Sequence, residues 1–395
     1  MEHPVRRAMR AARTALLVLA VTFFMDILAS QVCSRYCSFW ANLDQIYDTR
    51  VRSAVYDHDL NRNISADVRW GNDRYRLVTN SLGFKDHEAR RVSLGSDRYR
   101  ILFIGDSFAE GIGIAYEDTF VGRVGAVLGA CNVEVLNAAV VSYSPTIYYR
   151  KLKYLIETLG LRVDEVVAFL DISDIEDEAN WYDLDVNDQV INLNARRKST
   201  PFRRFRHWFR DNSMTVKLGY TIGDYVRTYW PRHAGPDAEE LLLDDAAARI
   251  RRATDQWRGL WTHDPRAWQA YGARGLEKSK RRMDRLVQLL RRHQVRLTLT
   301  VYPWPAQMFE NDRDSIQVVA WRDWAKKNNV GFVDLFPAFL DAGSPADVLS
   351  RFFIPFDIHW NAAGHGFVAR RLLTHRAMRR PVFKPCQDQR KPATR

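Results

Sequence analysis

Five short apolar runs recur after Tyr99, and stretches with helical spacing separate them. The runs cover residues 101–104, 133–136, 166–170, 297–302 and 330–333. Strands that alternate with helical segments are typical of βαβ units, and continuous apolar runs are typical of parallel strands that are buried on both faces. The pattern therefore predicts an α/β fold built on a parallel sheet.

The chain opens with an apolar segment that has a basic flank. The apolar run covers residues 14–25 and resumes after Asp26, and the arginines before it are Arg6, Arg7, Arg10 and Arg13. This arrangement is typical of export or membrane anchoring. We expect residues 1–40 to form a short cytoplasmic tip and a transmembrane signal anchor. The remainder would then lie outside the cytoplasm, in the periplasm if the source is a Gram-negative bacterium.

A cleaved signal peptide is the alternative, because the run is short for a spanning helix of about 20 residues. Signal peptidase prefers small residues at the first and third positions before the cut. Cleavage after Ala29 would put Ile27 at the third position, and cleavage after Ser30 would put Leu28 there. The anchor is therefore favoured over cleavage, and a buried helix of a cytosolic protein is favoured least.

Two further segments flank or interrupt the α/β pattern. Residues 41–95 contain short alternating runs, such as 74–79, and a turn signal at 80–83, so we expect a small β-rich lead-in. Residues 96–380 then form the main domain, with a mostly helical insertion at about 176–271, where strand runs are absent. The tail at 381–395 is polar.

Within the insertion, aromatic residues recur at helical spacing with arginines between them. The aromatic residues are Phe202, Phe205, Trp208 and Phe209, and the arginines are Arg203, Arg204, Arg206 and Arg210. The segment could contact a membrane surface or an anionic glycan. A helix that packs its aromatic residues inward and exposes its arginines is the favoured interpretation.

Composition narrows the classes of partner and cofactor. The chain is 46% hydrophobic with 12 tryptophans, which suits a packed core, and its formal net charge is +12. This charge suits an anionic partner, but nucleic acid is disfavoured for a domain outside the cytoplasm. The four cysteines have no zinc-site spacing and form no disulfide scaffold, although an oxidising compartment would permit a bridge. We expect no cofactor and no metal.

A candidate nucleophile follows the first predicted strand. The segment 101–107 ends in Gly-Asp-Ser, and the glycines of 108–113 allow a tight turn from strand to helix. Ser107 would therefore lie at the carboxyl end of a sheet strand, where open α/β folds bind ligands. Taken alone, the motif is weak, because Asp106 and Ser107 are also ordinary helix N-caps.

A candidate base and its partner lie near the other end of the chain. Asp357 and His359 are two residues apart, and in an extended loop both side chains would point to one side. The carboxylate could then hold the imidazole tautomer while the other ring nitrogen faces a serine. Asn361 can cap the following helix, and His365 is expected to be a structural residue of its first turn. No histidine pair has metal-binding helical spacing, so a metal-dependent hydrolase is disfavoured.

These two blocks, in this order, resemble the SGNH (GDSL-type) hydrolase superfamily from about residue 80 to about residue 375. The resemblance implies a flavodoxin-like three-layer αβα sandwich. It also implies Ser107 as the nucleophile, His359 as the general base and Asp357 as its orienting partner. Candidate substrate contacts are Asp106, Asp171, Asp174, Trp360 and Asn361.

The middle blocks depart from the family pattern. The family's oxyanion hole combines the N–H of the serine with a glycine and an asparagine, and here Ser142 and Ser173 stand at those two positions beside Ser107. Losing one oxyanion donor can cost about 3 to 4 kcal/mol of transition-state stabilisation. Similar aspartate-rich replacements occur in exported relatives of the alginate O-acetyltransferases.

Three functions follow as hypotheses. The first is a membrane-tethered esterase, most plausibly an O-acetyl esterase, that acts on an envelope or secreted glycan or another ester. The second is an O-acyltransferase that passes the acyl group to a sugar hydroxyl, with a membrane-bound partner as the acyl donor. The third is a glycan-binding or assembly subunit that has lost catalysis.

Overall fold

The computed structural model describes residues 4–36, 49–70, 73–193, 205, 208–209, 212–219 and 249–383. The chain divides into two units, which we describe separately. One comprises Met1–Gln45 and Ala195–Asp244, and the other comprises Ile46–Asn194 and Asp245–Arg395. Phe202 and most of the polar tail lie outside the described residues, as does the middle of the expected insertion.

A five-stranded parallel sheet forms the centre of the larger unit. All five apolar runs are strands, which confirms the predicted α/β class. In chain order the sheet reads 2-1-3-4-5, the order of flavodoxin-like sheets. From one edge to the other, its strands are β6 (Val133–Asn137), β5 (Tyr99–Ile104), β7 (Glu165–Leu170), β10 (Arg296–Val301) and β11 (Gly331–Asp334).

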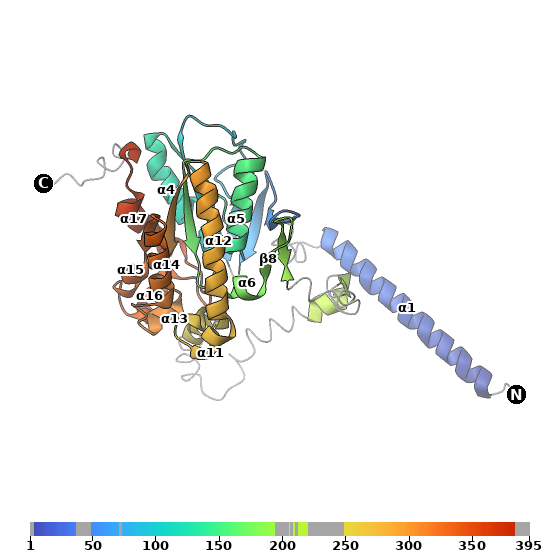
Figure 1. The fold of residues 1–395 in the computed structure, drawn as a ribbon. Helices are drawn as coiled ribbons and strands as arrows, with labels where there is room; N and C mark the ends of the chain where they lie inside the picture. Colours follow the sequence, from blue (N-terminus) through green and yellow to red (C-terminus); the bar gives the residue numbers. More distant parts are fainter. Residues whose placement is uncertain are drawn as a thin grey trace. The chain divides into compact units, whose positions relative to one another are not determined.

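Helices cover both faces of this sheet, so the architecture is the expected three-layer αβα sandwich (Figure 1). On one face, α4 (Phe120–Leu128) packs against α17 (Ala362–Thr374), and on the other, α5 (Pro145–Lys153) packs against α12 (Ala273–Arg292). Helix α14 (Ile316–Lys327) joins the α12 face, where the Trp324 indole N–H donates to Asp284 at 2.8 Å. The central strands are therefore buried on both sides, as their continuous apolar runs require.

Short elements at the carboxyl ends of the strands surround the position of Ser107. A strand pair lies among them, within the interval that the sequence predicted to lack strands. The elements are α3 (Ser107–Glu110), α6 (Asp174–Asn180), β8 (Tyr182–Leu184), β9 (Val190–Asn192), α11 (Pro265–Ala267), α13 (Pro305–Phe309), α15 (Phe336–Leu340) and α16 (Pro345–Phe352).

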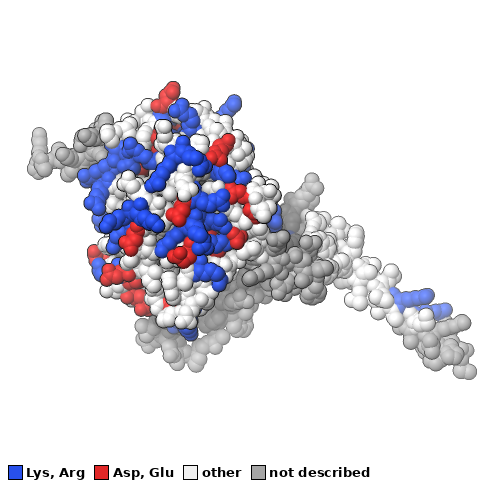
Figure 2. All heavy atoms as spheres, in the orientation of Figure 1, with Lys and Arg blue, Asp and Glu red and all other residues white. Residues whose placement is uncertain are grey.

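The outer face of α12 carries many of the basic side chains (Figure 2). The β8–β9 hairpin neutralises part of this charge. Arg282 forms an ion pair with Asp183 at 2.5 Å, and Arg285 forms one with Asp188 at 2.6 Å. The high net charge of the chain is therefore partly used inside the fold, which weakens it as evidence for an anionic partner.

The lead-in contains two antiparallel hairpins. They are formed by β1 (Arg50–Ser53) with β2 (Asp57–Leu60), and by β3 (Ser65–Trp70) with β4 (Asp73–Val78). The lead-in is attached to the turn that follows β5. The ammonium group of Lys85 is fully buried and donates to the carbonyls of Gly111 and Ile114, each at 2.6 Å. Arg50 forms an ion pair with the buried Glu110 at 3.0 Å.

The smaller unit contains α1 (Pro4–Tyr36), whose stretch Ala12–Val32 has a mean hydropathy of 2.0. This stretch is long and apolar enough to cross a membrane, although a signal sequence near an N-terminus has the same properties. Most of its side chains are exposed on the protein itself. A single apolar N-terminal helix is therefore present, as the sequence predicted.

Gly105 allows the close approach of β5, β7 and the following turn, so its substitution tests this packing. A Cβ atom at this position would lie 2.6 Å from the Ala109 Cβ and 3.0 Å from the Phe169 Cβ. We expect Gly105→Ala to lower the free energy of unfolding by about 1 to 3 kcal/mol, measured by urea denaturation. Gly95→Ala is the control, because a Cβ there has no atom within 4 Å. Equal stability of both variants would contradict this account.

Candidate active site

Ser107 is the first residue of the four-residue helix α3, directly after β5. Asp106 caps this helix by accepting the N–H of Phe108 at 3.0 Å, and Gly111 ends it in the left-handed conformation. As the first helical residue, Ser107 has a backbone N–H without an intrahelical acceptor. The sharp turn therefore presents both the hydroxyl and the N–H of Ser107 at the carboxyl end of the sheet. The side chain lies in a confined place, because the residue is only 7% exposed.

Asp357 and His359 lie on the loop between α16 and α17, and this loop is a tight turn. The extended loop that the sequence analysis assumed is therefore wrong. The Asp357 Oδ1 atom accepts both the backbone N–H of His359 at 3.0 Å and the ring Nδ1 at 2.6 Å. Aspartate commonly closes such turns by accepting an N–H two residues ahead. The pair is close because of this turn, and not because of alternation along an extended chain.

The imidazole of His359 joins this turn to Ser107. Its Nε2 atom lies 2.8 Å from the Ser107 Oγ atom, although 252 positions separate the two residues. The structure therefore brings together the three residues that the sequence singled out as a triad. Ser107 also has a longer contact of 3.2 Å with the Asp106 carboxyl.

The hydrogen bonds define the tautomer of His359. A carboxylate can only accept, so Nδ1 carries the proton that is shared with Asp357. In the neutral ring, Nε2 then has a free lone pair and accepts the Ser107 hydroxyl. The Phe108 ring, with its centroid 4.8 Å from that of the imidazole, limits rotation of the ring. This is the arrangement in which an imidazole can remove a hydroxyl proton.

Trp70, the last residue of β3, was not among the residues predicted for the site. Its indole N–H donates to the Asp357 Oδ2 atom at 2.7 Å, and its ring meets the His359 ring edge-on at 5.5 Å between centroids. Both carboxylate oxygens of Asp357 are therefore engaged. Trp70 precedes Asp357 by 287 positions, so no local pattern could have connected them.

The surroundings of Asp357 favour its charged form. Burial alone would raise the pKa of this carboxyl, but the hydrogen bonds and charge of His359, together with the indole N–H of Trp70, hold the pKa well below its ordinary value. A carboxylate that accepts several N–H bonds commonly behaves in this way. Asp357 therefore stays ionised and can stabilise an imidazolium on His359.

Asp106, Asp171 and Asp174 are buried and bonded to protein groups, so the structure gives them no contact with a ligand. Asp171 accepts the hydroxyl of Ser173 and, at 2.7 Å, the indole N–H of Trp304. Asp174 accepts the hydroxyl of Tyr148 at 2.9 Å. Burial, and next the charge of Asp171, raises the pKa of both Asp106 and Asp174. Their contact with substrate stays a prediction.

Trp360 and Asn361 are also structural in this arrangement. Trp360 is fully buried and stacks on Phe339 with ring centroids 5.7 Å apart. The Asn361 side chain caps α17 and also donates to two backbone carbonyls of the preceding turn, so its hydrogen-bonding groups are used. The capping role predicted for Asn361 is confirmed. His365 Nδ1 accepts the Phe120 N–H at 3.1 Å, which confirms its structural role.

The two other expected oxyanion donors differ from each other. Ser142 has a left-handed backbone (φ 61°) on the loop after β6, where its neighbour Val141 donates its N–H to Glu110 at 2.7 Å. Glycine adopts this conformation most readily. Ser173 donates both its N–H and its hydroxyl to Asp171, at 2.7 and 2.5 Å. In this arrangement Ser173 therefore has no donor left for an oxyanion, and Ser107 itself supplies the clearest one.

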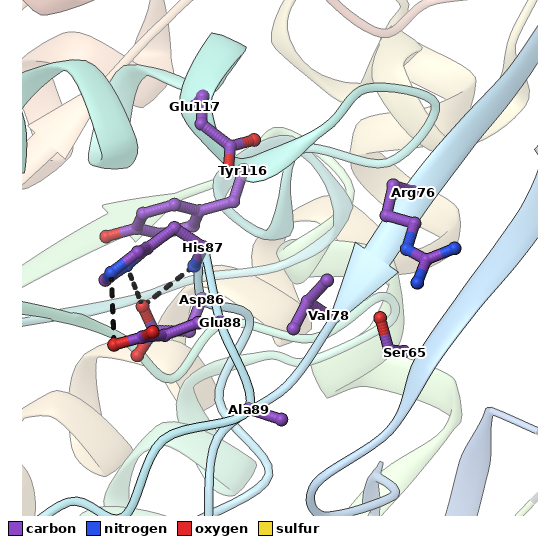
Figure 3. A pocket seen from close by; sticks show the side chains of 9 residues that line it. All are labelled: Ser65, Arg76, Val78, Asp86, His87, Glu88, Ala89, Tyr116 and Glu117. Atoms are coloured by element: carbon purple, nitrogen blue, oxygen red, sulfur yellow. Dashed lines mark hydrogen bonds and ion pairs between the residues drawn. The ribbon is translucent and has the colours of Figure 1, made fainter.

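A separate hollow of about 440 Å³ lies beside the lead-in, and none of the three triad residues lines it (Figure 3). Its wall carries both signs of charge, from Arg76, Asp86, His87, Glu88 and Glu117. Asp86 is already engaged, because it pairs with His87 at 2.7 Å and with Arg90 at 2.9 Å. The hollow therefore presents no set of unpartnered groups that would define a ligand.

Comparisons with known proteins give only distant likenesses. No protein-family model matches the sequence, and no curated protein matches it. Among solved structures, similarity extends to a psychrotrophic esterase from Pseudoalteromonas sp. at 10% identity, with 69% of this chain and 93% of that chain covered and a TM-score of 0.35. It also extends to a catalytic mutant of an acetylxylan esterase from Geobacillus stearothermophilus at 14% identity, with coverages of 72% and 98% and a TM-score of 0.36.

A third similar structure is that of TesA, at 10% identity, with coverages of 73% and 99% and a TM-score of 0.38. Likenesses at this level carry no argument about the reaction. The function therefore has to be argued from the geometry around Ser107.

The indole N–H of Trp70 can be removed while an aromatic ring is kept at this position. We expect Trp70→Phe to slow covalent labelling of Ser107 by a fluorophosphonate about tenfold, because one hydrogen bond to a charged group is lost. The measurement is the labelling rate of the purified full-length protein. Trp257→Phe, at a half-exposed indole, is the control. A rate in Trp70→Phe that equals that of the control would show that Asp357 does not depend on the indole.

The raised pKa values predict a pH dependence of stability. A carboxyl with a raised pKa holds its proton more tightly in the folded state than in the unfolded state. Its contribution to the free energy of unfolding is therefore complete below the unfolded pKa of about 4 and is lost as the pH rises through the folded pKa. Burial raises the pKa of Asp177 to about 7, and Asp174 is also raised. We expect these carboxyls to lower the free energy of unfolding between pH 5 and pH 8, while the lowered pKa values of His365 and His375 act in the opposite direction in part of this range.

Asp174→Asn should make this fall smaller than in the wild type, because one carboxyl with a raised pKa no longer titrates. The measurement is urea denaturation at both pH values. Asp347→Asn, at a half-exposed side chain in α16, is the matched control and should keep the wild-type slope. Equal slopes in wild type and Asp174→Asn would exclude Asp174 as a source of the dependence.

Proposed function

We propose that this protein is an extracytoplasmic serine acyl-ester hydrolase in which Ser107, His359 and Asp357 form the catalytic triad. The observation that carries the proposal is the continuous chain of short contacts from hydroxyl to imidazole to carboxylate, at 2.8 and 2.6 Å. A serine hydroxyl is a weak nucleophile until a base removes its proton, and the base needs an oriented tautomer. This arrangement supplies both requirements.

The proposed reaction begins when His359 Nε2 takes the proton of Ser107. The Oγ atom then attacks the carbonyl carbon of the ester, and Asp357 stabilises the imidazolium without taking its proton. The imidazolium gives the proton to the departing alkoxide, which leaves an acyl-serine. Water, activated by the same imidazole, releases the acid. Trp70 acts as a positioning residue, because its indole N–H orients the Asp357 carboxylate, which in turn orients the imidazole of His359.

Stabilisation of the oxyanion is proposed to rely on the backbone N–H of Ser107, with the loop at Ser142 as the second candidate donor. The side chain of Ser173 is assigned no role in catalysis, because Asp171 holds both of its donors. An oxyanion hole with one donor fewer costs transition-state stabilisation. We therefore expect a slow esterase rather than a fast one.

The placement outside the cytoplasm has two supports. The apolar helix near the N-terminus follows several arginines, which favours retention of the short N-terminus in the cytoplasm. Cys131 is also disulfide-bonded, and disulfides are typical of exported proteins. We propose that α1 anchors the protein and that the larger unit lies on the outer side of the membrane.

The proposed substrate is an O-acetyl ester on an envelope or secreted glycan. Ser107 and His359 are 7% and 8% exposed, so the acyl group has to be small or slender to reach them. Transfer to a sugar hydroxyl would use the same acyl-serine, with the acceptor in place of water. Mass spectrometry of a glycan incubated with an acetyl donor and the protein distinguishes transfer from hydrolysis.

The triad is tested with full-length protein in detergent and a small acetyl ester. We expect Ser107→Ala and His359→Ala each to lower kcat/KM by at least about a thousandfold. The double variant should be no worse than either single variant, because the two residues act as a unit. Ser350→Ala, at an exposed serine in α16, should keep wild-type activity. Wild-type rates in Ser107→Ala, or simple multiplication of the two effects, would reject the triad.

A further inference from the structure

The described residues between 205 and 219 contact one side of α1 within the smaller unit. Phe209 stacks on Phe23 with ring centroids 5.6 Å apart, and Trp208 lies tilted against the same ring at 6.5 Å. About two turns further along α1, the Gln31 side-chain amide donates to Asn212 at 2.9 Å. The segment therefore contacts about two turns of the apolar helix.

A polar contact lies between these two points. Asp26 is the one acidic residue of the apolar stretch Ala12–Val32, and its Oδ1 atom accepts two hydrogen bonds from Thr215. The backbone N–H donates at 2.8 Å and the hydroxyl at 2.7 Å. An acidic side chain in a membrane segment is costly and is usually found with a partner. Thr215 provides that partner.

Several apolar side chains of the segment remain exposed, including Trp208, which also lies against Phe23. Phe205, Trp208 and Leu218 are 54%, 46% and 43% exposed, which is high for large apolar side chains. In the sequence, Arg206, Arg210 and Lys217 alternate with them. Tryptophan and basic residues together favour the boundary between lipid headgroups and acyl chains.

The depth of the Asp26 contact fits that boundary. Asp26 precedes Val32, the end of the apolar stretch, by six residues, which is about 9 Å along a helix. Interfacial helices commonly bury their apolar side about 5 to 10 Å into the bilayer. The segment therefore meets α1 in the half of the apolar stretch that faces the outer side of the membrane.

We infer that the segment around Phe205, Trp208 and Thr215 is a second membrane contact, which docks on α1 and inserts its exposed aromatic side chains among the lipids of the outer leaflet. This inference rests on the proposed membrane helix. It replaces the inward-packing interpretation of the aromatic residues, because among the described aromatic residues of the segment only Phe209 has its ring against α1 without large exposure. The insertion would thus contact the bilayer at a point that lies far from the anchor in the sequence.

Lipid contact is measured by fluorescence quenching in the full-length protein. The starting variant carries Cys33→Ser and Cys37→Ser, and the fluorophore bimane is attached to a Phe205→Cys substitution made in it. The signal of the starting variant treated with bimane is subtracted. The vesicles contain phosphatidylcholine and phosphatidylglycerol with brominated acyl chains. We expect quenching several-fold stronger than for bimane at Val186→Cys, a fully exposed position in the larger unit. Quenching at Phe205→Cys no stronger than at Val186→Cys would overturn the inference.

A label at Leu19→Cys separates this inference from the proposed anchor. Quenching at Leu19→Cys without quenching at Phe205→Cys rejects the second contact alone, whereas the absence of both rejects the membrane helix as well. An anionic glycan is the competing occupant of the segment. A bimane response to soluble polygalacturonate, without quenching by brominated lipid, would assign the segment to glycan and overturn the lipid contact.

The contact with Asp26 is tested in the same assay. Thr215→Val keeps the shape of the side chain and removes the hydroxyl, so one hydrogen bond to a charged group is lost. We therefore expect quenching at Phe205→Cys to fall at least twofold. Thr22→Val is the matched control, because the Thr22 hydroxyl bonds only to the Val18 carbonyl of the same helix. Equal quenching in the two variants would show that docking does not use Thr215.

Discussion

The 2.8 Å contact between the Ser107 hydroxyl and the His359 ring is the interaction on which the rest of the site depends. It joins the turn after β5 to the loop before α17, and the sheet order brings both to the same end of the molecule. Other contacts hold the two partners in place. Lys85 and Glu110 connect the lead-in to the serine turn, and Trp70 reaches across to the acid. The lead-in is therefore part of the site and not only a connection to the anchor.

Carboxyl groups near the site fall into two electrostatic classes. Asp357 accepts three N–H groups, and its pKa is lowered despite burial. Asp106 and Asp174 are buried near Asp171, and their pKa values are raised. The negative charge that faces the imidazole is therefore concentrated on one residue, while its neighbours favour the neutral form. This division follows from burial and hydrogen-bond count, because all of these residues are aspartates.

The sequence predicted the features that depend on short-range patterns. The five apolar runs form the sheet, Asn361 caps α17 as predicted, and the three residues predicted as a triad form a continuous series of hydrogen bonds. Features that depend on distant residues were missed. Trp70 lies in a hairpin, and nothing in the sequence around it points to Asp357. Ser173 donates to Asp171 through a local turn, which the alternation of apolar and polar residues does not predict. The predicted substrate contacts of Asp106, Asp171 and Asp174 stay predictions, and in the fold these buried carboxyls bond to other protein groups.

The turn that holds Asp357 against His359 has a consequence for motion. Acid and base are carried on one short loop, and the carboxylate accepts both the backbone and the ring of the same residue. The serine, in contrast, is carried by the separate turn after β5. A displacement of the acid–base loop away from that turn would keep the imidazole oriented by its carboxylate but separate it from the hydroxyl, so proton transfer from Ser107 would stop.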